Sequence, residues 1–93
     1  MTINSLFRII EKRRKELPHN SYVASLLKKG DDRVIQKIGE EAIEVVIAAK
    51  NKDKQKLVTE VADLWFHLLI LLSLKEIKPD DILEELKKRH NNH

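Results

Sequence analysis

Apolar residues recur at helical intervals along most of the chain, and turn-forming residues separate them into segments. In the first segment, Leu6, Ile10 and Leu17 have this spacing and predict a helix over residues 5–17. Pro18 ends it, because a proline disfavours helical geometry at the preceding residue.

Two further helices are predicted before the middle of the chain. A short one begins at Ser21, whose hydroxyl is suited to cap it, and stops at Gly30, which can take the left-handed geometry that closes a helix. A long one runs over residues 33–50, with Asp31 or Asp32 as its cap.

The remaining segments predict another long helix and a final short one. The polar break at residues 51–53 precedes the helix predicted over residues 54–75, which therefore forms an antiparallel hairpin with its predecessor. Pro79 is a favoured first-turn residue and opens the last helix, which finishes in the basic residues 87–89. Residues 91–93 are expected to fray.

Residues 64–72 are apolar around the whole helix circumference apart from His67. A helix of that kind must be covered on every side, which the few short neighbours in this chain cannot do. A second copy would cover it. The sequence therefore predicts an all-α fold for residues 1–93 as a single domain: an antiparallel helical hairpin with flanking short helices, whose four-helix-bundle core is completed by homodimerisation.

Composition excludes several classes of protein. A chain of 93 residues is too short for a two-domain enzyme with a cofactor-binding fold, and the absence of cysteine removes disulfides, thiolate catalysis and Cys-ligated metals. The net charge of +3 is too balanced to demand nucleic acid or an anionic membrane. No signal peptide is visible, and no unbroken apolar stretch approaches the roughly 20 residues of a membrane span. We therefore expect a cytoplasmic protein without nucleic-acid or membrane partners.

The candidate chemistry lies on the two long helices. At about 100° per residue, Glu40, Glu41 and Glu44 share one edge of the third helix, and Glu60 and Asp63 lie together on the fourth. Facing carboxylates repel one another, so a cation should lie between them. Oxygen ligands without cysteine favour a hard cation, Mg²⁺ with Mn²⁺ as a possible substitute, and the surplus of acid suggests two or more ions.

Several polar and aromatic residues are considered together with these acids. Arg33, Lys37 and Asn51 extend the polar edge of the third helix along its axis. His67 is most simply a hydrogen-bonded core residue, and Tyr22 is most simply a packing residue. None of them identifies a covalent nucleophile.

The acidic pattern resembles a known signature. Residues 39–44 (GEEAIE) followed by residues 60–63 (EVAD) are similar to the EExxE…ExxD metal motif of the all-α nucleoside triphosphate pyrophosphatases. Within that superfamily the chain is most similar to the phosphoribosyl-ATP pyrophosphohydrolase family. Further similar segments are residues 21–27 (SYVASLL), 36–41 (QKIGEE), 47–51 (IAAKN) and 63–69 (DLWFHLL). Two positions depart from the family pattern: Val23 replaces a usual threonine and Phe66 a common tyrosine.

The resemblance implies hydrolysis of 1-(5-phosphoribosyl)-ATP to 1-(5-phosphoribosyl)-AMP and pyrophosphate, the second step of histidine biosynthesis. It implies Mg²⁺ held by Glu41, Glu44, Glu60 and Asp63, with Glu40 binding another ion or orienting the attacking water. Expected catalytic residues are Glu40, Glu41 and Glu44.

The resemblance also implies a nucleotide substrate and a set of residues that contact it. Expected substrate contacts are Arg33 and Lys37, with Lys50, Asn51, Ser21 and Tyr22 as weaker candidates. The companion cyclohydrolase activity is expected on another polypeptide, because 93 residues leave no room for it.

Three alternatives remain at this stage. A house-cleaning nucleoside triphosphate pyrophosphatase would use the same metal chemistry on a different nucleotide. A non-enzymatic helical interaction module would use the acidic edge to bind a basic partner. A ferritin-like di-iron site is disfavoured, because the Glu-x-x-His pairs that it needs are absent from the long helices.

Overall fold

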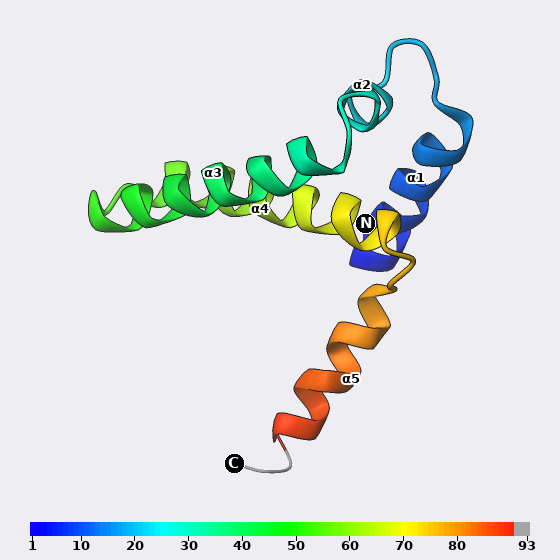
Figure 1. Cartoon of the computed structure of the whole chain (residues 1–93). Helices are drawn as coiled ribbons and strands as arrows, with labels where there is room; N and C mark the ends of the chain where they lie inside the picture. Colours follow the sequence, from blue (N-terminus) through cyan, green and yellow to red (C-terminus); the bar gives the residue numbers. More distant parts are fainter. Residues whose placement is uncertain (91–93) are drawn as a thin grey trace.

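The computed structural model describes residues 1–90, and all regular structure in that range is helical (Figure 1). This confirms the predicted all-α class; residues 91–93, expected to fray, lie outside the described residues. The helices are α1 (Ile3–Glu16), α2 (Tyr22–Lys28), α3 (Asp31–Lys50), α4 (Lys54–Leu74) and α5 (Pro79–His90).

The two longest helices, α3 and α4, lie side by side and run in opposite directions through the turn at residues 51–53 (Figure 1). The helices α1 and α2 pack where α3 begins and α4 ends. The last helix, α5, projects away from this body and meets it mainly through α1. The hairpin therefore forms the long arm of the molecule, and α1 and α2 lie against one end of it.

Side-chain caps begin three of the helices. Ser21 caps α2 as predicted, since its hydroxyl accepts a hydrogen bond from the backbone N–H of Ala24 at 3.3 Å. Thr2 caps α1 in a reciprocal capping box with Ser5, and Asp53 caps α4 by accepting from the N–H of Lys56 at 3.0 Å. Each cap satisfies a backbone donor that has no partner within its own helix.

The predicted junction between α2 and α3 was wrong in detail. Lys29, not Gly30, is the C-cap residue of α2. Gly30 is instead the N-cap of α3, with a φ of +98°, a conformation that a side chain would strain. Asp31 and Asp32 lie in the first turn of α3 and do not cap it. Acidic residues are favourable there too, because the positive end of the helix dipole extends over the first turn.

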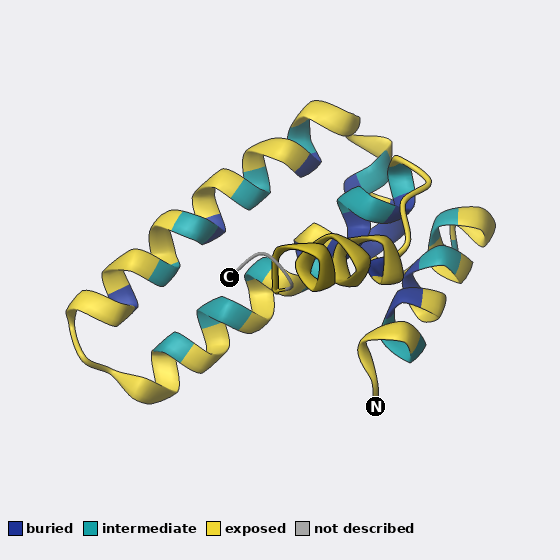
Figure 2. Ribbon diagram, turned by 90° about the horizontal axis from the view of Figure 1, so that it is seen from below, coloured by how far each residue is buried: buried dark blue, intermediate teal, exposed yellow. Residues whose placement is uncertain are grey.

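The core forms where α1, α2, α3 and α4 meet, and Figure 2 shows most of the buried residues at that end of the hairpin, with further buried positions along α3. A polar contact ties α1 to α4 beside it. Arg14 donates from Nε to the hydroxyl of Ser73 at 2.8 Å, and Ser73 is fully buried. The core residues are Phe7, Ile10, Val23, Leu26, Val34, Leu69 and Ile70.

Large apolar faces stay exposed on both long helices of this single chain. The exposed residues include Ile35, Ile43, Val46 and Ile47 on α3, and Val58, Trp65 and Leu68 on α4. By length and composition α4 could cross a membrane, and only 22% of its most apolar stretch is buried. One such helix is a weak indication of a membrane protein, because core helices of soluble proteins have the same composition.

Candidate metal and substrate site

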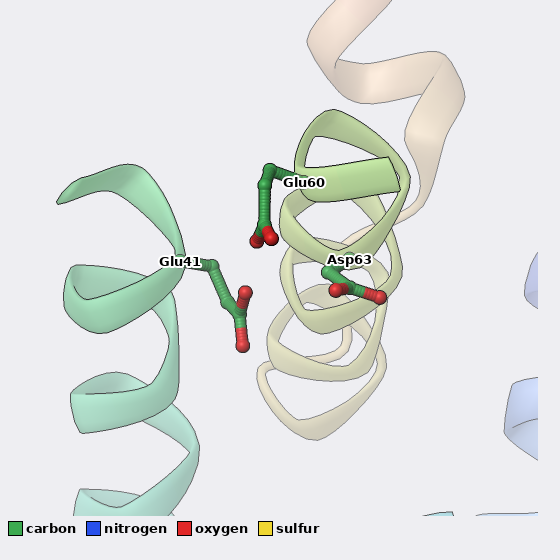
Figure 3. A group of neighbouring side chains, drawn as sticks. All are labelled: Glu41, Glu60 and Asp63. Atoms are coloured by element: carbon green, nitrogen blue, oxygen red, sulfur yellow. The ribbon is translucent and has the colours of Figure 1, made fainter. Parts of the chain in front are cut away.

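Three carboxylates from two helices converge in the middle of the hairpin. Glu41 reaches from α3 toward α4, where Glu60 and Asp63 lie about one turn apart (Figure 3). One carboxylate oxygen from each residue lies within 4.8 Å of the other two. The predicted meeting of acids from both helices is therefore present in the structure for these three residues, which we call the acidic cluster.

Burial differs across the acidic cluster. Glu41 is buried, with 8% of its surface exposed, Glu60 is half-buried and Asp63 is exposed. On α3, Glu41 shares its face with the buried residues Val34 and Ala48, each seven positions away. A charged carboxylate on a buried face destabilises the fold unless a nearby cation compensates its negative charge. The donors are all carboxylate oxygens and one side is open to solvent, which suits Mg²⁺ or Mn²⁺.

Lys37 is the cation that the structure places at this site. Its Nζ lies 3.2 Å from Oε1 of Glu41, one turn away on the same helix. The pKa of Lys37 is raised above its ordinary value of 10.5, because the Glu41 carboxylate stabilises the charged ammonium more strongly than partial burial opposes it. Lys37 therefore carries a positive charge at neutral pH.

Glu40 and Glu44, the other predicted acidic ligands, are not part of this close group. Glu40 pairs instead with Arg33, whose Nη1 lies 3.2 Å from Glu40 Oε1. Glu44 is exposed on α3. Their roles as ligands or in orienting water stay predictions.

A cavity of about 560 Å³ adjoins the acidic cluster. Lys37, Glu41 and Asp63 are its charged lining residues, and aromatic and aliphatic side chains from α1, α2 and α4 form the rest. A site lined by both charged and apolar residues fits a ligand with an anionic part and a flat apolar part. The remaining lining residues are Leu6, Tyr22, Ala62, Phe66 and His67.

Tyr22 and His67 form a hydrogen-bonded pair in this cavity. The Tyr22 hydroxyl lies 2.7 Å from Nε2 of His67, and Nδ1 of His67 lies 2.7 Å from the backbone carbonyl oxygen of Asp63. A carbonyl can only accept, so Nδ1 donates to it, and in the neutral tautomer with that arrangement Nε2 accepts from the Tyr22 hydroxyl. The Tyr22 oxygen then presents only acceptor capacity to a ligand.

This pair explains both residues better than sequence patterns did. His67 is 6% exposed and hydrogen-bonded, as its interpretation as a core residue predicted, but it also lines the cavity. Tyr22 is half exposed, which argues against a pure packing role. Helix periodicity could not reveal the pair, since the two residues are 45 positions apart on different helices.

Three of the weaker predicted substrate contacts lie elsewhere in the fold. Ser21 is buried as the cap of α2. Lys50 and Asn51 are exposed at the far end of α3, about 13 Å or more along the axis from Glu41 at 1.5 Å per residue. Within this chain they do not line the cavity beside the acidic cluster.

The two departures from the family pattern have different consequences. Val23 is 4% exposed and belongs to the hydrophobic core, so its side chain is not available to a ligand. Phe66 lines the cavity, and its ring centroid lies 6.2 Å from that of Tyr22. Only the departure at Phe66 therefore bears on the cavity.

Comparison with known proteins shows which proteins this chain is similar to. Residues 3–90 match the family described as phosphoribosyl-ATP pyrophosphohydrolase (PRA-PH). The chain is 51% identical over 87 residues to phosphoribosyl-ATP pyrophosphatase of Methylococcus capsulatus, covering 94% of this chain and 83% of that protein. It is 50% identical over 80 residues to the protein of the same name from Chromobacterium violaceum, covering 86% and 74%.

A longer relative shows the same similarity over part of its length. The histidine biosynthesis bifunctional protein HisIE of Bacillus subtilis is 47% identical over 89 residues. That match covers 96% of this chain and 43% of the bifunctional protein.

Proposed function

Since this chain belongs to the phosphoribosyl-ATP pyrophosphohydrolase family, we propose that it hydrolyses 1-(5-phosphoribosyl)-ATP to 1-(5-phosphoribosyl)-AMP and pyrophosphate in histidine biosynthesis. The observation that carries the proposal is the acidic cluster of Glu41, Glu60 and Asp63 beside a cavity that also contains a lysine and two aromatic rings. This combination suits a polyphosphate attached to a nucleoside.

The acidic cluster would hold Mg²⁺, with Glu44 as a further ligand and Glu40 as a ligand or water-orienting base. When bound, the cation would neutralise the phosphate oxygens and make an attacking water more acidic. Lys37 would contribute a fixed positive charge to the same phosphates as negative charge develops in the transition state. Water is the nucleophile in this proposal, because no serine or cysteine lines the cavity.

The apolar lining residues of the cavity would hold the nucleoside. Phe66 and Tyr22 offer ring surfaces, and the Tyr22 oxygen offers a hydrogen-bond acceptor. Arg33 would contact a phosphate that extends beyond the cavity. Its pair with Glu40 is partly exposed, and neither residue lines the cavity. Phosphates and nucleoside would thus be recognised by different residues of one site.

The functional unit would be a cytoplasmic homodimer. The exposed apolar faces of α3 and α4 support this proposal, because two such hairpins could bury them against each other in a four-helix core. The dimer also accounts for the composition of α4, which is more apolar than the contacts within one chain require.

The direct test is pyrophosphate release from 1-(5-phosphoribosyl)-ATP, measured with Mg²⁺ and after chelation of all divalent cations. We expect turnover only with the metal present. A panel of ordinary and damaged nucleoside triphosphates should give at least about 100-fold lower kcat/KM. Turnover of that panel without action on phosphoribosyl-ATP would contradict the proposed substrate and favour a house-cleaning pyrophosphatase.

A further inference from the structure

The most enclosed carboxylate of the acidic cluster already has a cationic partner within the chain. Lys37 Nζ lies 3.2 Å from Oε1 of Glu41, and the two side chains are only 22% and 11% exposed. An ammonium and a divalent cation this close to one carboxylate would repel each other strongly. This repulsion disfavours the present position of Lys37 once a metal ion binds Glu41.

We propose that Lys37 is a resident counter-ion that a divalent cation displaces from Glu41, and that the displaced ammonium then binds a phosphate of the substrate. This inference rests on the proposed function, because it assumes that the acidic cluster binds a metal. The proposal links two events at one residue. Metal binding frees the Lys37 ammonium from Glu41, and the freed ammonium then pairs with the negatively charged substrate.

The geometry allows this exchange without movement of the helices. Lys37 lines the cavity together with Glu41 and Asp63, so its ammonium can turn from the carboxylate into the space beside it. The lysine side chain is a flexible stem with a compact charge at its end, and such a group changes partner by rotation about its own bonds. In the metal-free protein Lys37 compensates the negative charge of Glu41. In the metal-bound protein its ammonium binds a phosphate of the substrate.

A second lysine–carboxylate pair provides a matched control. Lys75 Nζ lies 3.4 Å from Oδ2 of Asp31, but Asp31 is outside the acidic cluster and its side chain is 58% exposed. If Lys37 acts only through the overall charge of the protein, removing Lys75 should have the same effect on metal binding. If Lys37 competes for Glu41, only its removal should matter.

The test is Mn²⁺ affinity without substrate, measured by calorimetry at one fixed pH for the wild type, Lys37→Met, Lys37→Gln and Lys75→Met. We expect both Lys37 variants to bind Mn²⁺ about fivefold more tightly, and Lys75→Met to bind within about twofold of the wild type. Circular dichroism will show whether each variant keeps its helical content. Unchanged or weaker binding in both folded Lys37 variants would overturn the displacement.

The second measurement is pyrophosphate release at saturating Mg²⁺. We expect kcat/KM of Lys37→Met to fall by about 100-fold although its metal affinity rises, because the charge that stabilises the phosphate is lost. A purely structural role for Lys37 would lower both quantities together and would overturn the inference. Full activity in Lys37→Met would overturn the phosphate contact.

The same experiments separate this inference from the proposed function. If the wild type binds no Mn²⁺, both fail. If the wild type binds Mn²⁺ and Lys37→Met binds it more tightly, but neither cleaves phosphoribosyl-ATP, the proposed substrate fails and the displacement of Lys37 stands. If the wild type is active and Lys37→Met binds metal no more tightly, only the inference fails.

Discussion

The burial of one carboxylate distinguishes Glu41 from the other acidic residues of α3. Glu40 and Glu44 are exposed, whereas Glu41 lies on the face that α3 shares with α4. Helical periodicity placed all three glutamates on one edge of α3. That edge spans about 100° of the helix circumference, so its members can differ in burial and in neighbours. Only the position of α4 decides which of them meets Glu60 and Asp63.

Glu60→Gln tests the acidic cluster directly. We expect kcat/KM to fall by on the order of 10²–10³-fold, because a neutral amide replaces an anionic oxygen ligand. Thermal stability without metal should stay equal or rise slightly, since repulsion among the carboxylates is relieved. Enzyme assays and melting curves measure the two effects.

The control for this substitution is Glu84→Gln on the exposed surface of α5, which should leave both quantities unchanged. Wild-type turnover in Glu60→Gln would remove that residue from the metal site. Glu44→Gln extends the test to the predicted ligand that lies outside the close group: a comparable loss would place Glu44 among the ligands.

Tyr22→Phe tests the hydrogen-bond acceptor in the cavity. Removing the hydroxyl keeps the ring but deletes the group paired with His67 at 2.7 Å. We expect KM for phosphoribosyl-ATP to rise by about two- to tenfold with little change in kcat, the loss of roughly one hydrogen bond. Steady-state kinetics measure both constants, and an unchanged KM would show that the hydroxyl does not contact the substrate.

At the scale of helices, the existence and type of each element could be predicted more securely than its ends. Periodicity and the positions of Pro18, Ser21 and Pro79 were sufficient for five helices. The junction at Gly30 was assigned to the wrong helix, because glycine suits the end of one helix and the beginning of the next equally well. The path of the chain through the junction resolved this choice.

Asp53→Ala tests how strongly the turn of the hairpin depends on its cap. The Asp53 carboxylate accepts from the N–H of Lys56 at 3.0 Å, and the loss of such a cap destabilises a protein by about 1 kcal/mol. We expect urea unfolding to show that decrease, while Asp53→Asn, which keeps the acceptor, should stay within about 0.5 kcal/mol of the wild type. Equal stability of the alanine variant would show that the cap contributes nothing.

At the scale of the whole molecule, the most apolar surfaces of the hairpin are turned away from its own core. The internal face of α3 includes Glu41, while Ile43 and Val46 are 61% and 60% exposed. On α4 Trp65 is 55% exposed. Exposed apolar faces are typical of surfaces that bind another molecule, which supports the proposed dimer.

Leu68→Asp tests the proposed dimer. Sedimentation should show the wild type as a dimer, and the charged side chain should split or unfold it, because an unpaired carboxylate would be buried at the interface. Circular dichroism reports whether helicity falls with dissociation. A stable soluble monomer of native helicity would contradict the idea that the two chains share one core.

The sequence by itself determined the helices and the acidic residues they carry, because periodicity, caps and charge spacing are local properties of the chain. It could not determine which acids converge or which aromatic pair lines the cavity. Those depend on how α3 rotates against α4 and where α2 crosses them, and these packing choices join residues far apart in the sequence. The tertiary structure thus placed Glu41 with Glu60 and Asp63, left Glu40 paired with Arg33, and brought Tyr22 to His67.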